Sequence, residues 1–176
     1  ALTIDPEFAL ACVYIAASYE VMGNRKESRR YYEKALQLKN RLSDKQMYII
    51  QAVLYSWSKD TYDKAIQANL RLLKIYPDDE TGNVLLGNLY FSLEKYKEAA
   101  ERYNVLVANK SKSAEVYAHL ANSLMAQGLY ENAKSVLESG KFTNRLGNPK
   151  MSLTLSTILS SSSPFLSKIG KLIGFL

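Results

Sequence analysis

The 176-residue sequence contains little of several residue types, and each shortage excludes a kind of site. The single cysteine, Cys12, excludes an internal disulfide framework and a zinc site built from several thiolates. The only histidine is His119, and no Ser, Cys or Asp stands at a spacing that would form a catalytic triad with it. The sequence also lacks a glycine-rich phosphate loop and paired carboxylates at metal-binding spacing. We therefore expect no catalysis, no cofactor and no metal.

Acidic residues are missing from the end of the chain, because every Asp and Glu lies at or before Glu138. The net charge is +6, yet the residues up to Glu138 carry nearly equal numbers of the two signs. The excess charge therefore belongs to a basic tail, and the rest of the chain is close to neutral.

What the sequence does contain is a unit that recurs about every 34 residues, most regularly at residues 80–113. Its apolar residues recur at three- and four-residue spacing, which predicts two short amphipathic helices separated by a polar break at Glu94 and Lys95. Gly87 and Ala99 allow the two helices to approach closely. One such hairpin cannot bury its apolar faces alone, so a fixed period indicates a stack of hairpins. The larger side chains that fill the contact are Leu86, Tyr90, Tyr96, Tyr103 and Leu106.

This pattern resembles the tetratricopeptide repeat, and three further stretches carry it in near-constant register. The matching residues are Cys12, Ile15, Ala16, Tyr19, Gly23, Tyr32 and Ala35; Ile49, Ala52, Tyr62, Ala65, Leu72 and Pro77; and Tyr117, Leu120, Ala121, Leu124, Gly128, Tyr130 and Ala133. The resemblance implies an all-α, right-handed superhelix of antiparallel helix-turn-helix repeats, an α-α solenoid. The expected repeats are 9–42, 46–79, 80–113 and 114–147. Residues 1–8 match the end of a preceding repeat, so we expect a fragment of a longer protein, and residues 148–176 form a degenerate repeat or capping helices.

Local signals predict where several helices begin and end. Gly23 supplies the permissive backbone of a helix C-terminus, and Ser43 with Gln46 forms a capping box. Asp60, Asp79 and Ser113 are the expected N-caps of later helices. Cys12 falls at an inward-facing position and is expected to be buried, as are most of the tyrosines. His119 is expected to be exposed to solvent.

In the family that this sequence resembles, the first helix of each repeat lines a concave groove that binds peptides. The groove positions implied by that resemblance are Ile50, Leu54, Trp57, Val84, Asn88, Phe91, Ala118, Asn122 and Met125, with Val13, Ala17 and Glu20 in the first repeat. Asn88 and Asn122 occupy equivalent places, where family members often hold an Asn that binds a peptide backbone. Trp57 and Phe91 would supply apolar anchors. The other interpretation is that these surfaces pack against preceding repeats, the C-terminal tail or a neighbouring molecule.

One subtype of the family clamps a C-terminal carboxylate with Lys and Arg at set positions. This sequence places no cation there; the residues are Val13, Ala17, Gln51, Thr81 and Leu85. Carboxylate clamping is therefore disfavoured. Nucleic-acid binding is disfavoured as well, because arrays that read bases are usually basic along the groove.

The segment from 164 to 176 is apolar on one side and basic on the other. It is too short to span a bilayer. The three interpretations are a helix that caps the last repeat, a helix that docks on a membrane surface or a partner, and a disordered tail. The residues that would dock are Phe165, Lys168, Ile169, Lys171 and Leu172.

The sequence thus predicts a non-catalytic protein-protein interaction scaffold that binds a peptide or partner protein, located in the cytoplasm. Two alternatives remain open. One is a regulatory or sensory segment of a larger bacterial signalling protein, such as a kinase, cyclase or transcriptional regulator, and the other is a membrane-associated assembly factor. No oligomeric state is indicated.

Overall fold

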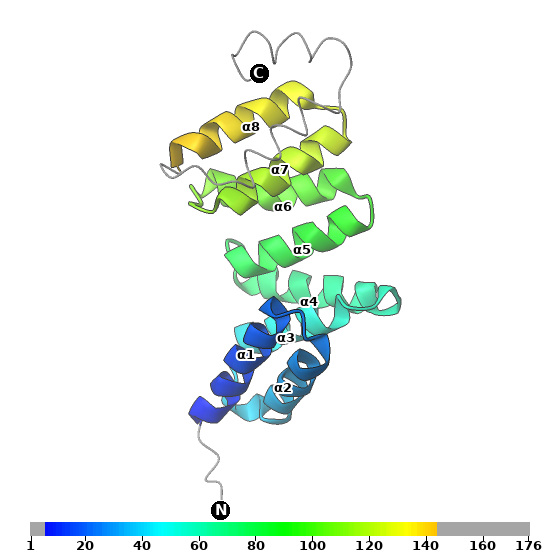
Figure 1. The fold of residues 1–176 in the computed structure, drawn as a ribbon, viewed down its shortest axis with the longest axis vertical. Helices are drawn as coiled ribbons and strands as arrows, with labels where there is room; N and C mark the ends of the chain where they lie inside the picture. Colours follow the sequence, from blue (N-terminus) through cyan, green and yellow to red (C-terminus); the bar gives the residue numbers. More distant parts are fainter. Residues whose placement is uncertain (1–5, 144–176) are drawn as a thin grey trace, which may run out of the picture. The chain divides into compact units, whose positions relative to one another are not determined.

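The computed structural model describes residues 6–143, and all regular structure in that range is helical. Figure 1 shows the helices as successive antiparallel pairs joined by short turns. Their bounds are α1 Pro6–Val21, α2 Arg25–Gln37, α3 Asp44–Tyr55, α4 Tyr62–Ile75, α5 Glu80–Ser92, α6 Tyr96–Ala108, α7 Ala114–Ala126 and α8 Tyr130–Thr143, with short 3₁₀ helices η1 Lys39–Arg41 and η2 Lys59–Thr61. The expected all-α class of helix-turn-helix repeats is confirmed. Predictions for residues 144–176, including Phe165, Lys168, Ile169, Lys171 and Leu172, lie outside the described residues.

The chain forms two compact units, and the boundary falls between Leu86 and Gly87, within α5. We call the part up to Leu86 unit 1 and the part from Gly87 unit 2. In unit 1, α1 packs on α2 and α3 packs on α4. In unit 2, α7 contacts both α6 and α8. Each unit buries its own apolar residues, as repeats that stabilise one another through neighbouring faces do.

One buried cluster of unit 1 forms where the inward faces of α1, α2 and α3 meet. Its buried members are Cys12, Ala16, Tyr32, Ala35, Ile50 and Val53. The burial of Cys12 confirms the expectation for its thiol. In unit 2 the buried residues of α7 and α8 include Ala114, Ala121, Ala133 and Leu137.

The tyrosines divide between core and surface, which corrects the prediction that most are core residues. Tyr32, Tyr103 and Tyr117 are buried, whereas Tyr14, Tyr76 and Tyr130 are exposed, and the others are partly buried. A tyrosine can lie at a core boundary with its ring buried and its hydroxyl in solvent, so a helical apolar pattern overestimates how deep it lies.

In the first, third and fourth repeats, the turn between the two helices contains a residue in the left-handed region. Gly23 and Gly128 fill this place with φ of 74° and 77°, and the expectation for Gly23 is confirmed. In the third repeat the equivalent residue is Glu94, with φ of 59°. A residue with a Cβ is strained there, so the polar break at Glu94 keeps the turn geometry without its preferred glycine.

The predicted N-cap residues can be compared with the observed starts of the helices. Ser43 and Gln46 form both halves of the capping box, and the Asp79 side chain accepts from the Gly82 backbone N–H at 2.8 Å. Ser113 stands at the start of α7, but its side chain makes no capping hydrogen bond. The prediction for Asp60 is wrong, because η2 intervenes and α4 begins at Tyr62.

These two serines provide a matched test of capping. Replacing Ser43 with Ala is expected to lower the free energy of unfolding by about 1 kcal/mol, because the Gln46 backbone N–H loses its acceptor. Replacing Ser113 with Ala is expected to change it by less than about 0.5 kcal/mol, since no capping bond is lost. Urea denaturation of both variants measures the difference, and equal losses would contradict the assignment.

Candidate functional site

A hydrogen bond between α6 and α5 defines the most specific polar arrangement in unit 2. The Tyr103 hydroxyl, on α6, donates to Asn88 Oδ1, on α5, at 2.6 Å. Tyr103 is only 1% exposed, whereas Asn88 is exposed. The buried Tyr103 side chain therefore restrains the exposed amide of Asn88. Within the described part of the chain, Asn88 Nδ2 makes no hydrogen bond.

The Tyr103 ring is enclosed by α5 on one side and α7 on the other. A Cβ at Gly87 would lie 2.7 Å from Tyr103 Cζ, which means that the ring rests directly on the backbone of α5. The ring also stacks on His119 of α7, with centroids 5.4 Å apart and planes 19° apart. Burial raises the pKa of the Tyr103 hydroxyl, so this group stays protonated and acts as a donor.

The same stacking corrects the prediction for His119. Its side chain is 34% exposed and lies against Tyr103, so it is a partly buried residue and not a freely solvated one. Its Nε2 lies 3.9 Å from Glu115 Oε1 on the same helix. Spacing along the sequence could not reveal this position, because the stacking partner comes from the preceding helix.

Other groove residues expected in unit 2 lie on the same two helices. Phe91 is 37% exposed, and its ring meets Tyr96 edge-on with centroids 5.2 Å apart. It lies three residues after Asn88, so the two share one face of α5. On α7, Asn122 and Met125 are partly buried. The side chain of Asn122 makes no hydrogen bond within residues 6–143.

In unit 1 the expected anchor Trp57 is already in contact with two side chains. The Tyr32 ring lies 6.2 Å away at a tilt, and the Arg29 guanidinium lies 5.5 Å from the ring centroid. The Tyr32 hydroxyl donates to Glu20 Oε2 at 3.2 Å. Desolvation and the nearby Glu20 carboxylate raise the Tyr32 pKa. Trp57 is therefore partly buried, as are Leu54, Val13, Ala17 and Val84.

Two predicted groove residues belong to the interior. Ile50 is 0% exposed and lies in the core of unit 1, and Ala118 is 7% exposed. Both side chains pack in the interior and are not exposed where a ligand could contact them. A helix face passes gradually from core to solvent, so an offset taken from the repeat pattern does not locate the edge of the core.

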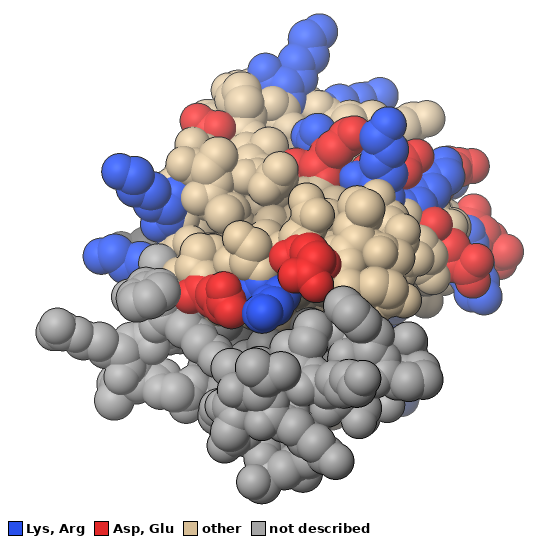
Figure 2. Space-filling model, turned by 90° about the horizontal axis from the view of Figure 1, so that it is seen from above, with Lys and Arg blue, Asp and Glu red and all other residues tan. Residues whose placement is uncertain are grey.

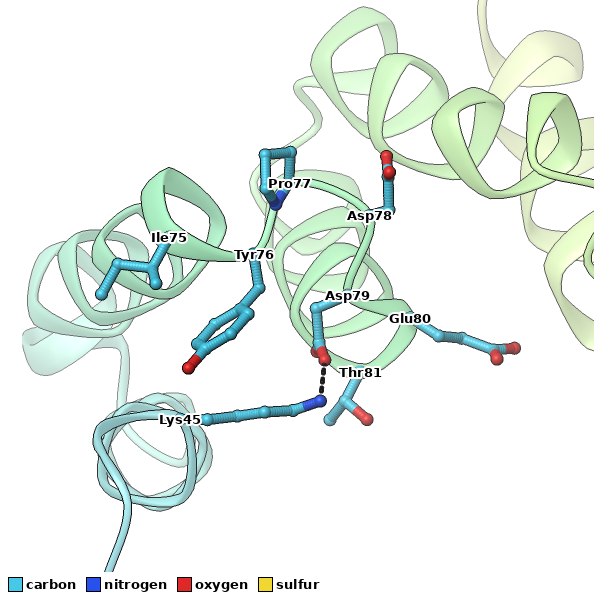
Figure 3. A pocket seen from close by; sticks show the side chains of 8 residues that line it. All are labelled: Lys45, Ile75, Tyr76, Pro77, Asp78, Asp79, Glu80 and Thr81. Carbon is cyan, nitrogen blue, oxygen red and sulfur yellow. Dashed lines mark ion pairs between the residues drawn. The ribbon is translucent and has the colours of Figure 1, made fainter.

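A second feature, in unit 1, is an open pocket of about 590 Å³ at the turn between α4 and α5 (Figure 3). The Lys45 ammonium pairs with Asp79 Oδ2 at 2.5 Å and lies 5.7 Å from the centroid of the Tyr76 ring. The hydrogen bond to Asp79 raises the pKa of Lys45. Since the other Asp79 oxygen caps α5, this pair joins the start of α3 to the start of α5. The pair was not predicted, although the two residues lie one repeat length apart.

Both signs of charge occur on the surface seen in Figure 2, where Lys, Arg, Asp and Glu are interspersed with uncharged residues. Across residues 6–143, no three His, Cys, Asp or Glu side chains gather as metal ligands would. None of the helices in the same range has the length and apolar character needed to cross a membrane.

The paired helices and their regular period define an α-helical repeat protein. Two family models, both described as tetratricopeptide repeat, match residues 9–41 and 84–139. The chain belongs to the tetratricopeptide repeat family.

Solved structures share this fold at low sequence identity. A MamA protein is 19% identical with a TM-score of 0.59, over 82% of this chain and 77% of that chain. The TPR2AB domain of yeast Sti1, in a complex with pHSP90, is 16% identical with a TM-score of 0.58, over 85% of this chain and 69% of that chain. No curated protein sequence matches the chain.

Proposed function

We propose that the chain is a protein-protein interaction scaffold and that unit 2 binds an extended peptide segment of its partner across α5 and α7. Membership of the tetratricopeptide repeat family supports the scaffold role. The observation that carries the peptide site is the exposed Asn88 amide, with its N–H₂ group unbonded beside the exposed Phe91 ring. An amide binds a peptide backbone and an aromatic ring binds an apolar side chain, so together they suit a peptide ligand.

The yeast Sti1 domain gives this proposal a structural parallel, because that protein is described in a complex with pHSP90. The likeness itself is one of fold, and a peptide ligand for this chain is part of our proposal. Recognition of a terminal carboxylate is not proposed, since Val13, Ala17, Gln51, Thr81 and Leu85 place no cation at the clamp positions. The proposed ligand is therefore an internal stretch of chain with an apolar side chain for Phe91.

The test uses twelve-residue peptides displayed on phage and selected on this chain, with the tightest one synthesised as the probe. Replacing Asn122 with Ala is expected to weaken its binding by about 3- to 10-fold, the worth of one net hydrogen bond. Stability should change little, because no internal bond is lost. The matched control is Asn132→Ala on the exposed surface of α8, which should leave affinity unchanged. Failure to select any peptide, or equal losses for both variants, would contradict the proposal.

A regulatory segment of a bacterial signalling protein and a membrane-associated assembly factor remain alternative hypotheses from the sequence. No observation on residues 6–143 favours either over the peptide scaffold.

A further inference from the structure

The third repeat holds a buried hydroxyl that packing does not require. In the fourth repeat, the residue equivalent to Tyr103 is Leu137, which is 0% exposed and packs against Ala121. An apolar side chain therefore fills this position well. Tyr103 instead carries a polar group into the interior, which is unfavourable unless the group is hydrogen-bonded. The partner that it finds is a surface side chain, Asn88.

The backbone of α5 is adapted to this hydrogen bond. Gly87 lets the Tyr103 ring lie against the helix, since any Cβ there would overlap the ring. The fourth repeat has Ala121 in place of Gly87 and Leu137 in place of Tyr103, while Asn122 is retained in place of Asn88. The glycine and the hydroxyl therefore occur together in the third repeat, and both are missing in the fourth.

Unit 1 shows that a buried tyrosine alone does not produce this arrangement. Tyr32 occupies the same place in the first repeat, next to Ala16, and its hydroxyl donates to Glu20 and not to the residue equivalent to Asn88, which is Ala17. The hydrogen bond of Tyr32 is also longer, 3.2 Å against 2.6 Å.

We propose that Tyr103 is a positioning residue that fixes the Asn88 amide with its N–H₂ group toward the bound peptide, so that this subsite selects a carbonyl oxygen. The inference rests on the peptide-binding function proposed above. A free amide can present either its oxygen or its nitrogen, but the Tyr103 hydroxyl occupies the oxygen. Asn122 has no such partner, because Leu137 offers no hydroxyl, and it can turn to suit either a carbonyl or an N–H.

The ligand-free test is the motion of the Asn88 side chain, measured by ¹⁵N relaxation of its N–H₂ group. We expect a rigid amide in the native chain and a mobile one in Tyr103→Phe, whereas the Asn122 amide is mobile in both. The matched control is Tyr32→Phe, which also removes a buried hydroxyl and should leave the Asn88 amide rigid. Equal mobility of the Asn88 amide in the native chain and in Tyr103→Phe would overturn the inference. The proposed peptide-binding function would not be affected by that result.

The binding test uses the phage-selected peptide in a double-mutant cycle. Tyr103→Phe is expected to weaken its affinity about 3- to 10-fold, and to cause no further loss in the Asn88→Ala background. Asn88→Asp keeps the acceptor for Tyr103 but removes the donor, and it should bind at least as weakly as Asn88→Ala. Equal effects of Tyr103→Phe in both backgrounds, or native affinity of Asn88→Asp, would overturn the inference.

The source of the carbonyl is identified by changing the probe. Replacing each Asn and Gln of the selected peptide with Ala should preserve the effect of Asn88→Ala if the acceptor is a backbone carbonyl, and abolish it if the acceptor is a side-chain amide. Both results support a carbonyl-selective subsite. A native chain that binds no peptide would overturn the proposed function and this inference together.

Discussion

Replacing Ile50 with Ala is expected to lower the free energy of unfolding by about 2–5 kcal/mol. Ile50 is 0% exposed and lies in the buried cluster that also contains Cys12 and Tyr32. The shorter side chain loses apolar contacts and leaves a cavity that close packing does not fill. Ile50→Val removes one methylene and should lose about 0.5–1.5 kcal/mol.

The matched control for Ile50 is Ile75→Ala near the end of α4, where the side chain is 50% exposed. This change should cost less than about 1 kcal/mol, because most surface substitutions have small effects. Urea denaturation compares the three variants. If Ile50→Ala and Ile75→Ala lost equally little stability while Ile50→Ala weakened peptide binding, Ile50 would be a groove residue as the sequence pattern implied.

Replacing Gly87 with Ala is expected to destabilise unit 2 by about 1–3 kcal/mol, even though Ala favours helices. The new Cβ would lie 2.7 Å from Tyr103 Cζ and 2.8 Å from its Cε1, and the ring is enclosed and 1% exposed. Overpacking of this kind costs about 1–3 kcal/mol and outweighs the gain of up to about 1 kcal/mol in helix propensity. Moving the ring would also stretch its hydrogen bond to Asn88.

A second substitution distinguishes overpacking from a general loss of structure. Gly87→Ala with Tyr103→Leu recreates the pair that the fourth repeat uses, Ala121 with Leu137. The double variant should be more stable than the sum of the two single changes predicts, as expected for side chains that share one contact. Strict additivity in urea denaturation would show that residues 87 and 103 do not press on each other.

The features that could be predicted from the sequence are those encoded locally or by the period. The capping box at Ser43 depends on residues three apart, and the cap at Asp79 immediately precedes its helix. The left-handed turn at Gly23 follows from its lack of a Cβ. The prediction that Asp60 is an N-cap was wrong because the additional turn η2 changes where α4 begins. A cap residue is defined by the start of its helix.

The candidate site depends on contacts between helices, and these were not predictable residue by residue. Asn88 and Tyr103 are 15 residues apart, and nothing in the spacing says whether the hydroxyl reaches the amide or solvent. The Lys45–Asp79 pair could have been found, because equivalent residues of successive repeats lie at neighbouring helix starts. The burial of Ile50 could not have been predicted, because the repeat pattern places one stripe of each helix in the core but does not fix the width of that stripe.

The most direct test of the scaffold account is the site of peptide binding, mapped by titrating the phage-selected peptide into ¹⁵N-labelled protein. The account predicts that the largest chemical-shift changes fall on the side-chain amides of Asn88 and Asn122 and on the backbone around Phe91 and Met125. Saturable changes confined to the pocket around Lys45, Tyr76 and Asp79, or to α6 and α8, would contradict it.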